Sequence, residues 1–315
     1  MALRVKSNVR DLEYPKNLRE FDRIFANDEA CLHFLEQVRW EKSFQCQACG
    51  ADKFWVLSTG LRRCQSCRFK NSVKTGSIFE SSRLNLKTWF YAIWLFTAQK
   101  TGVSALNLQK NLGLGSYRSA WLLLHKIRNS MIFADRSLLQ GEVEVDEAFI
   151  GGVRSGKRGR GAEGKELIVI AAECSGLKRV GRIRIQRIPN ASAETLEAFI
   201  LANITPGSTI HTDGWPSYNA VSKLGYKHLP RPSATVNPDE LLPRINIVTA
   251  LLKRWILGTL HGRLNPKHMD NYFEEFIFRF NRRTSTARGL LFQRVLENSV
   301  RIQPVPYQEV ISRKP

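Results

Sequence analysis

Residues 142–152 read Glu142-Val-Glu-Val-Asp146-Glu-Ala-Phe-Ile-Gly-Gly152, and the class of fold depends on them. Acidic and apolar residues alternate in the first half, which is the period of a β-strand with one face in a core. Successive side chains of a strand point to opposite faces, so Asp146 lies on the face opposite to Val143 and Val145. The pair Gly151-Gly152 is a turn signal and predicts the end of the strand.

The chain after this strand continues with further strands and helices. An apolar run and an alternating run, joined at Ser175-Gly176, predict two antiparallel strands. A helix with Ser192 as its N-cap and a fourth strand ending at Asp213-Gly214 come next. The expected elements are strands over 167–172, 179–188 and 208–213, and helices over 193–202, 241–257 and 267–283. The order β-β-β-α-β followed by helices predicts an α+β fold in which helices cover a mixed sheet.

The chain before this strand is predominantly helical. A tight turn at Gly113-Leu-Gly115-Ser116 separates a short helix from a longer one over 117–133. This pair resembles a helix-turn-helix unit that binds DNA. The longer helix carries four basic or titratable residues, Arg118, His125, Lys126 and Arg128. Two helices that only pack together would give the same pattern, and this alternative stays open.

Four of the six cysteines form the two pairs Cys46-x-x-Cys49 and Cys64-x-x-Cys67. This spacing is close to that of a zinc ribbon, in which four thiolates close a tetrahedron around Zn²⁺ and leave no open position for a substrate. The sequence therefore predicts a structural zinc site, against the alternative of four unrelated buried cysteines. Cys31 and Cys174 are isolated and are interpreted as small packed side chains. Basic residues around the pairs favour DNA binding by the ribbon; they are Arg62, Arg63, Arg68, Lys70 and Lys74.

The 315 residues include 48 Lys and Arg against 28 Asp and Glu, a formal net charge of +20. A hydrophobic fraction of 43% excludes a disordered or collagen-like chain, so the excess charge predicts a polyanionic partner, nucleic acid before an anionic membrane surface. No apolar run approaches the roughly 18–20 residues that span a bilayer, and the first residues lack the apolar core of a signal peptide. We therefore expect an intracellular protein. One Gly-rich loop beside the first strand is strongly basic, with Arg154, Lys157, Arg158, Arg160 and Lys165.

Asp146 and Asp213 are the two carboxylates that the strand pattern singles out. Carboxylates presented from neighbouring strands can share divalent cations that prefer oxygen ligands. Metal ions held in this way serve phosphoryl transfer, which suits a chain whose charge predicts nucleic acid. Each aspartate taken alone could instead be an ordinary turn carboxylate at a strand end.

Several motifs together resemble those of the IS1595-type (ISXO2-like) insertion-sequence transposases, from the cysteine pairs to about Leu296. The motifs are Val143-Glu-Val-Asp146-Glu-Ala-Phe-Ile-Gly-Gly152, His211-Thr-Asp213-Gly-Trp-Pro-Ser-Tyr218, Leu252-Lys253-Arg254-Trp255 with Gly258-Thr259, and Glu275-Phe-Ile-Phe-Arg-Phe-Asn281-Arg-Arg283. The resemblance implies a ribonuclease H-like catalytic domain of the DDE class, with Asp146 as its first acid and Asp213 as its second. The domains expected on this basis are a helical segment over 1–40, a zinc ribbon over 41–75, a helical DNA-binding segment over 76–138, the catalytic domain over 139–300 and a tail over 301–315.

At the position of the family's third acid, this chain has an asparagine and not a glutamate. Asn246 precedes Lys253 by seven residues, so both lie on one face of a helix. The resemblance is to family members with Asn followed by Lys, in which the Asn oxygen is a metal ligand and the Lys binds a DNA phosphate. Competing candidates for the third ligand are Glu240, Glu274 and Glu275.

The activity implied is DNA transposition. Mg²⁺ or Mn²⁺ held by Asp146, Asp213 and Asn246 would activate water to cut an element end and then direct the freed 3′-OH at target DNA. The ribbon and the helical segment would bind the terminal inverted repeats, with the protein acting as a homo-oligomer on DNA in the bacterial cytoplasm at the nucleoid. A domesticated, non-catalytic DNA-binding regulator and a ribonuclease H-like nuclease without transposition are the alternatives. His211 and His261 are either ligand-orienting, DNA-contacting or structural residues.

Overall fold

The computed structural model describes residues 14–41, 43–133, 136–151, 165–176, 179–231, 241–262 and 264–312. The chain divides into two compact units. The first comprises Met1–Phe133 with Ser285–Ser312, and the second comprises Ala134–Thr284 with Arg313–Pro315.

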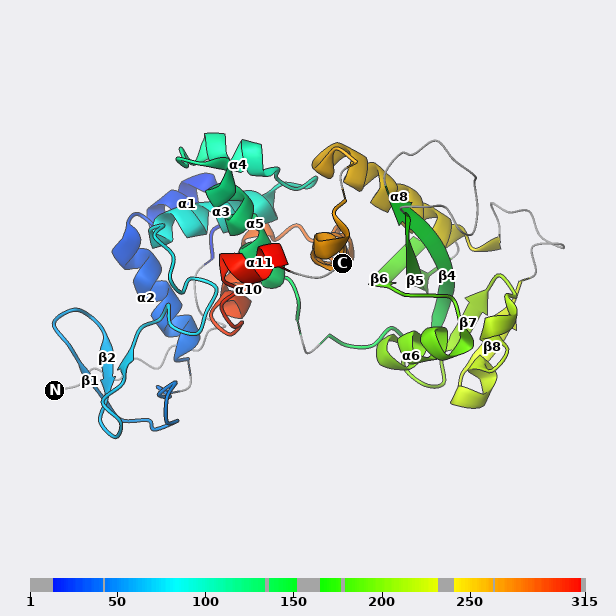
Figure 1. The fold of residues 1–315 in the computed structure, drawn as a ribbon, viewed down its shortest axis with the longest axis horizontal. Coiled ribbons are helices and arrows are strands. Elements are labelled where there is room, and N and C mark those ends of the chain that lie inside the picture. The colour runs from blue at the N-terminus through cyan, green and yellow to red at the C-terminus, as the bar shows by residue number, and fades with distance from the viewer. Residues whose placement is uncertain are drawn as a thin grey trace. The chain divides into compact units, whose positions relative to one another are not determined.

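The second unit contains a five-stranded mixed sheet with the strand order β6-β5-β4-β7-β8 (Figure 1). The strands β4, β5 and β6 are antiparallel neighbours, whereas β7 and β8 run parallel to β4. Their bounds are β4 Glu142–Gly151, β5 Lys165–Ser175, β6 Arg179–Arg187, β7 Thr209–Thr212 and β8 Lys227–Pro230. Together with the helices described below, this topology is that of a ribonuclease H-like domain, and the predicted α+β fold is confirmed. The edge strand β8 was not predicted, because its four residues carry no apolar alternation.

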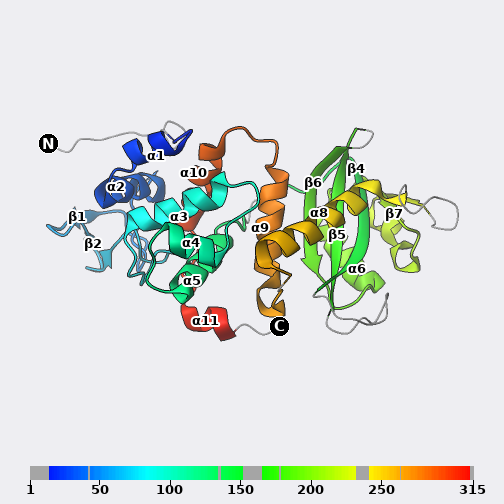
Figure 2. The ribbon, with the colours of Figure 1, turned by 90° about the horizontal axis from the view of Figure 1, so that it is seen from above.

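Helices cover both faces of this sheet (Figures 1 and 2). The face of β4 that carries Ile150 packs against α8 and α9 through Leu252 and Phe273. The opposite face, with Val143 and Val145, packs against α6. The bounds are α6 Ala193–Asn203, α8 Pro243–Leu260 and α9 Met269–Asn281, with short 3₁₀ turns at η2 Pro216–Tyr218, η3 Val221–Leu224 and η4 Pro266–His268. Asp146 therefore lies on the face of the sheet that α8 and α9 cover.

The first unit combines a small three-stranded sheet with helices. Its strands are β1 Phe54–Val56, β2 Arg62–Cys64 and β3 Lys70–Asn71, and its helices are α1 Leu18–Ile24, α2 Asp28–Arg39, α3 Leu86–Ala98, α4 Ala105–Asn111, α5 Tyr117–Asn129, α10 Arg288–Ser299 and α11 Tyr307–Ser312. Side chains of Asn17, Asn27, Asn85, Ser104 and Ser116 cap the first turns of the five helices that follow them. None of the helices in the described residues is both long and apolar enough to cross a membrane.

Helix α10 packs in the first unit, whereas the sequence predicted a catalytic domain that continues to residue 300. The reason is a cluster of aromatic rings. The ring of Phe292 lies 5.5 Å from that of Phe21 and 5.8 Å from that of Phe90, and all three side chains are fully buried. The carbonyl of Ser299 also accepts the backbone N–H of Ile78 at 3.2 Å. A stretch that follows the second unit in sequence thus completes the core of the first.

The pair α4 and α5 forms the expected short helix, tight turn and longer helix, with Gly113 at φ +60° in the turn. Three of the four basic or titratable residues of the longer helix are buried, however: His125, Lys126 and Arg128 are 0, 7 and 3% exposed. They lie on the face of α5 that packs inward, and the Lys126 amine donates to the carbonyl of Ile78 at 3.4 Å. The exposed end of α5 is its N-terminus, with Tyr117 and Arg118.

Candidate active site

Asp146 and Asp213 are brought together by the parallel pairing of β4 and β7. Glu144 on β4 is the register partner of His211 on β7, and each aspartate lies two residues beyond this pair. Val145 belongs to the opposite apolar core, so Asp146 points to the face predicted from the alternation. Asp213 follows the last residue of its strand directly.

Local hydrogen bonds hold the carboxylate of Asp146, within β4, and that of Asp213, directly after β7. Asp213 Oδ1 accepts the backbone N–H of Trp215 at 2.9 Å, which is an Asx-turn. Gly214, between them, adopts φ +83°, a conformation that favours glycine. Asp146 Oδ1 accepts the backbone N–H of Glu147 at 2.8 Å. Each carboxylate is therefore held by a backbone N–H that lies one or two residues further along the chain.

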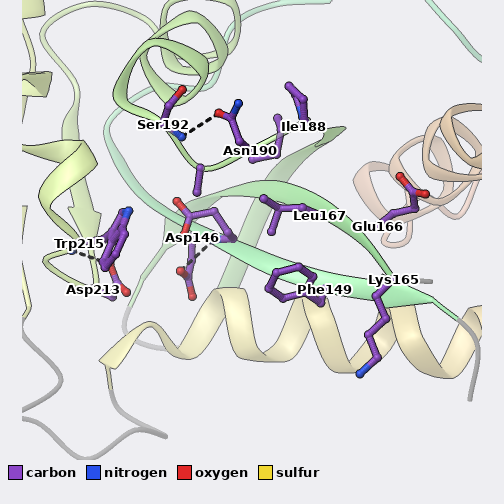
Figure 3. Close-up of a pocket in the computed structure, with 13 residues that line it drawn as sticks. Asp146, Phe149, Lys165, Glu166, Leu167, Ile188, Asn190, Ser192, Asp213 and Trp215 are labelled. Carbon is purple, nitrogen blue, oxygen red and sulfur yellow. Dashed lines mark hydrogen bonds between the residues drawn. The ribbon is translucent and has the colours of Figure 1, made fainter. Parts of the chain in front are cut away.

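The two acids line a cleft of about 810 Å³ (Figure 3). In the figure Asp146, Asp213 and Trp215 lie at one end of the cleft, and Lys165 and Glu166 lie at the other. Asn190 and Ser192, at the start of α6, form part of its wall. The wall therefore combines carboxylates with a lysine, an aromatic ring and small polar side chains.

Negative charge is concentrated in the site, and a bound cation would balance it. Burial raises the pKa of Asp146 from its ordinary value of 3.8 to about 7, and the negative charges of Asp213 and Glu147 act in the same direction. A divalent metal ion bound between the carboxylates would balance this negative charge. The donor set of carboxylate oxygens fits a hard cation such as Mg²⁺ or Mn²⁺.

A second carboxylate of the same motif takes part in the site's structure. The fully buried Tyr218 donates its hydroxyl to Glu147 Oε1 at 2.6 Å. This bond joins the Val143–Gly152 motif to the His211–Tyr218 motif. Sequence analysis did not select Glu147 or Tyr218, although their positions in two of the quoted motifs are a signal that could have done so.

Asn246 and Lys253 are both exposed on α8, seven residues apart and so on one side of the helix. Neither is among the described residues that line the cleft. The cleft therefore contains two of the three predicted metal ligands, and the third stays a prediction.

The competing candidates for the third ligand are glutamates. Glu240 lies outside the described residues. Glu274 and Glu275 are already engaged by arginines: Arg136 Nη1 is 2.8 Å from Glu274 Oε2, and Arg279 Nε is 2.8 Å from Glu275 Oε1.

The remaining candidates of the sequence analysis are placed as follows. His211 is buried, and burial first and Arg231 second lower its pKa. His261 ends α8 in the left-handed region at φ +51°. Lys165 is exposed at the start of β5, and Arg154, Lys157, Arg158 and Arg160 lie outside the described residues.

The four paired cysteines form one cluster. Their sulfur atoms all lie within 4.8 Å of one another, with Cys46 and Cys67 at 3.5 Å and Cys49 and Cys64 at 3.6 Å. Tetrahedral Zn²⁺ with Zn–S bonds of about 2.3 Å requires sulfur separations of roughly 3.8 Å, so the cluster fits this ion. Asn71 Nδ2 lies 3.5 Å from Cys46 Sγ and donates to it, in the manner of an outer-shell partner of a metal ligand.

The outer surface of the ribbon carries basic and aromatic side chains. Trp55 and Phe69 are 43 and 38% exposed, and the Arg68 guanidinium lies 4.5 Å from the centroid of the Trp55 ring. Lys70 is also exposed. Arg62, in contrast, stacks on Trp40 at 3.8 Å and so serves packing. We call Trp55, Arg68, Phe69 and Lys70 the ribbon surface.

A four-cysteine ribbon followed by a ribonuclease H-like sheet with two acids in one cleft is the arrangement of the DDE-class transposases. Two family models match the chain: an ISXO2-like transposase domain over residues 138–281 and a transposase zinc-ribbon domain over residues 26–70. The chain therefore belongs to the IS1595-type, ISXO2-like family of insertion-sequence transposases, as the sequence motifs predicted. The zinc-ribbon match and the cysteine cluster together support a structural Zn²⁺.

Two further likenesses were found. A protein of Halobacterium salinarum, described as an uncharacterized protein in transposable element ISH50, is 24% identical over 225 residues, which cover 64% of this chain and 72% of the relative. A chain in the cryo-EM structure of a simian T-cell lymphotropic virus intasome in complex with PP2A regulatory subunit B56 gamma is 17% identical and covers 64% of this chain and 73% of its own length. The TM-score of that match is 0.33, which is too low to bear on function.

Proposed function

We propose that this transposase cuts the ends of an insertion sequence and joins the freed 3′-OH to target DNA, with Asp146, Asp213 and Asn246 as the ligands of the catalytic metal. The observation that carries the proposal is the meeting of Asp146 and Asp213 in one cleft, where burial and mutual repulsion raise the pKa of Asp146 to about 7. The name of the ISH50 relative, a protein in a transposable element, supports the same interpretation.

The divalent ion would supply charge that stabilises the attacking and leaving oxygens of the phosphodiester. The residues of the chain would hold the ion and the DNA. Asp146 and Asp213 would hold the ion from the sheet, and Asn246 would add a neutral carbonyl oxygen from α8. Lys253, on the same side of α8, would hold a DNA phosphate. The engagement of Glu274 and Glu275 by arginines supports Asn246 over those two as the third ligand.

A plasmid assay tests the activity. The substrate is supercoiled plasmid DNA that carries the coding region with its genomic flanks, incubated with zinc-loaded protein and Mg²⁺ or Mn²⁺. The expected products are DNA cut at the element boundaries and molecules in which those ends are joined to new sites. Cleavage without joined products would identify a nuclease instead. DNA binding without any metal-dependent cleavage would identify a regulator, the alternative that an asparagine at the third position leaves open.

DNA binding by the ribbon surface is a second part of the proposal. The double variant Arg68→Ala and Lys70→Ala should weaken binding to the element end and reduce the slope of log K against log salt by about 0.9 for each phosphate that the protein no longer neutralises. A fluorescence-anisotropy titration at several salt concentrations measures this slope. Lys223→Ala is the matched control, because Lys223 is an exposed lysine outside the ribbon. An unchanged slope in the double variant would show that the ribbon surface does not contact the DNA.

The proposed partners are accordingly the terminal inverted repeats, bound by the ribbon and the N-terminal end of α5, and the target DNA. Joining two ends in one event requires at least two active sites, so we propose a homo-oligomer on DNA at the nucleoid. Size measurement by light scattering, with and without end-containing DNA, checks this assembly.

A further inference from the structure

Glu144 is a fully buried carboxylate on the same face of β4 as Asp146. Its side chain meets the N-terminus of α8, 100 residues further along the chain. Glu144 Oε2 accepts the backbone N–H of Arg244 at 2.8 Å and that of Ile245 at 3.1 Å, and Oε1 accepts Arg244 Nη1 at 2.8 Å. One carboxylate therefore binds two backbone groups and one guanidinium of the same helix.

The cap of α8 comes from the sheet. The first N–H groups of a helix lack partners within the helix, and a neighbouring Ser, Thr, Asp or Asn usually accepts one of them. In α8 the N-cap position is Leu242, which provides no side-chain hydrogen bond. Glu144 takes this role, and its negative charge is also favourable at the positive end of the helix dipole. Arg244 adds a bond from Nη2 to the carbonyl of Gly176 at 2.8 Å, beside the end of β5.

The consequence concerns the position of Asn246. Asn246 directly follows Ile245, whose N–H is bonded to Glu144, and Asp146 is two residues from Glu144 on the same strand. The cap joins Glu144 to the backbone of Ile245. Asp146 is two residues from Glu144 and Asn246 is one residue from Ile245, so both proposed ligands lie next to this connection. A neutral amide oxygen is a weaker ligand than a carboxylate, so its affinity for the metal depends more on correct placement.

We propose that Glu144 is a positioning residue, which holds the N-terminal turn of α8 against β4 and thereby sets Asn246 relative to Asp146. This inference rests on the proposed metal-binding role of Asn246. A contact that served only to pack helix on strand could be apolar, because a buried ion pair of this kind is often no more stabilising than apolar side chains of similar volume.

The test is a double-mutant cycle in the affinity for Mn²⁺. The four proteins are the parent, Glu144→Gln, Asn246→Ala and the combination, each loaded with zinc and titrated with Mn²⁺ while the free ion is measured by electron paramagnetic resonance. We expect Glu144→Gln to weaken Mn²⁺ binding by about 10- to 100-fold, the usual effect of removing an outer-shell partner. In the Asn246→Ala background the same change should have little further effect, because the ligand that Glu144 positions is already absent.

The possible outcomes of the cycle distinguish a positioning role of Glu144 from other roles. Additive effects would overturn the positioning role, since Glu144 would then act on the metal through its charge or through global stability. Unchanged Mn²⁺ affinity in Glu144→Gln would overturn it as well. Unchanged affinity in Asn246→Ala would contradict the ligand assignment in the proposed function, whatever Glu144 does.

Two further variants serve as controls for this experiment. Glu173→Gln removes another carboxylate of the sheet that pairs with an arginine, Arg182, with 2.5 Å between Oε1 and Nη2. It should lower the melting temperature and leave Mn²⁺ affinity unchanged. If Glu144→Gln does not fold, Glu144→Gln with Arg244→Gln leaves no unpaired buried charge and carries the same expectations.

Discussion

The variant Asp146→Asn is expected to lose metal-dependent cleavage by on the order of 10³-fold or more while it still binds end-containing DNA. The amide has the size of the carboxylate but lacks the charge that would hold the ion from β4. Plasmid cleavage measures the loss, and an anisotropy titration measures the retained binding. Full cleavage activity in the variant would contradict the assignment of Asp146 to the active site.

The same variant should be more stable than the parent in the absence of divalent metal. The pKa of Asp146 is raised from 3.8 to about 7 by burial and by Asp213 and Glu147, so its charged form is disfavoured in the folded state. The folded state therefore loses stability as pH rises from about 4 to about 7, and the penalty is complete above pH 7. The amide of the variant cannot ionise, so the variant should lack this loss. Thermal melts between pH 4 and pH 8 with EDTA test the sign, and added Mg²⁺ should stabilise the parent more than the variant.

Asp270→Asn is the matched control for both measurements. Asp270 lies at the start of α9 in the same unit, with an exposed side chain, 3.7 Å from Arg187. Its replacement should change neither cleavage nor the pH dependence of stability beyond the small effect of an exposed ion pair. If Asp270→Asn behaved like Asp146→Asn, the changes in cleavage and stability would result from the loss of any negative charge and not from the active site.

The second large effect is expected from Cys64→Ser. Cys64 is fully buried in the four-cysteine cluster, and structural zinc sites contribute roughly 10–16 kcal/mol of binding free energy that is also folding free energy. The variant should lose bound zinc, become sensitive to proteases over residues 43–75 and lose affinity for the element end. Elemental analysis, limited proteolysis and anisotropy measure the three results.

Cys174→Ser separates zinc binding from the general loss of a thiol. Cys174 is half-buried on β5, in the other unit and outside the cluster. This variant should retain the zinc content and the DNA affinity of the parent. Zinc that stayed bound in Cys64→Ser would contradict the four-thiolate site.

The fold could be predicted largely from local patterns. The alternation around Asp146, the run over 167–172 and the N-cap at Ser192 are properties of neighbouring residues, and each predicted the right type of element. The ribbon was predicted for a similar reason, since paired cysteines separated by a short spacer can surround one ion without help from distant segments. The family followed from motifs of this kind.

The errors and omissions concern contacts between distant segments. The sequence left open whether α4 and α5 bind DNA or only pack together, and the structure shows that Lys126 and Arg128 of α5 are buried. Helix α10 was assigned to the catalytic domain, but Phe292 completes an aromatic core with Phe21 and Phe90. Helical periodicity does not say which face another segment will cover, so neither result could be predicted from local pattern.

The sequence by itself determined the order β4-β5-β6-α6-β7 with helices after it, the zinc-ligand spacing and the face of β4 on which Asp146 lies. These depend on chain geometry over a few residues. Only the tertiary structure decided that Asp146 and Asp213 share a cleft, and that Glu144, on the same face as Asp146, is a buried cap for α8. The physical reason is that burial and hydrogen-bond partnership depend on which surfaces meet in the folded chain. The bond between Glu144 and Arg244 joins residues 100 positions apart, a separation at which no repeat or spacing in the sequence indicates a contact.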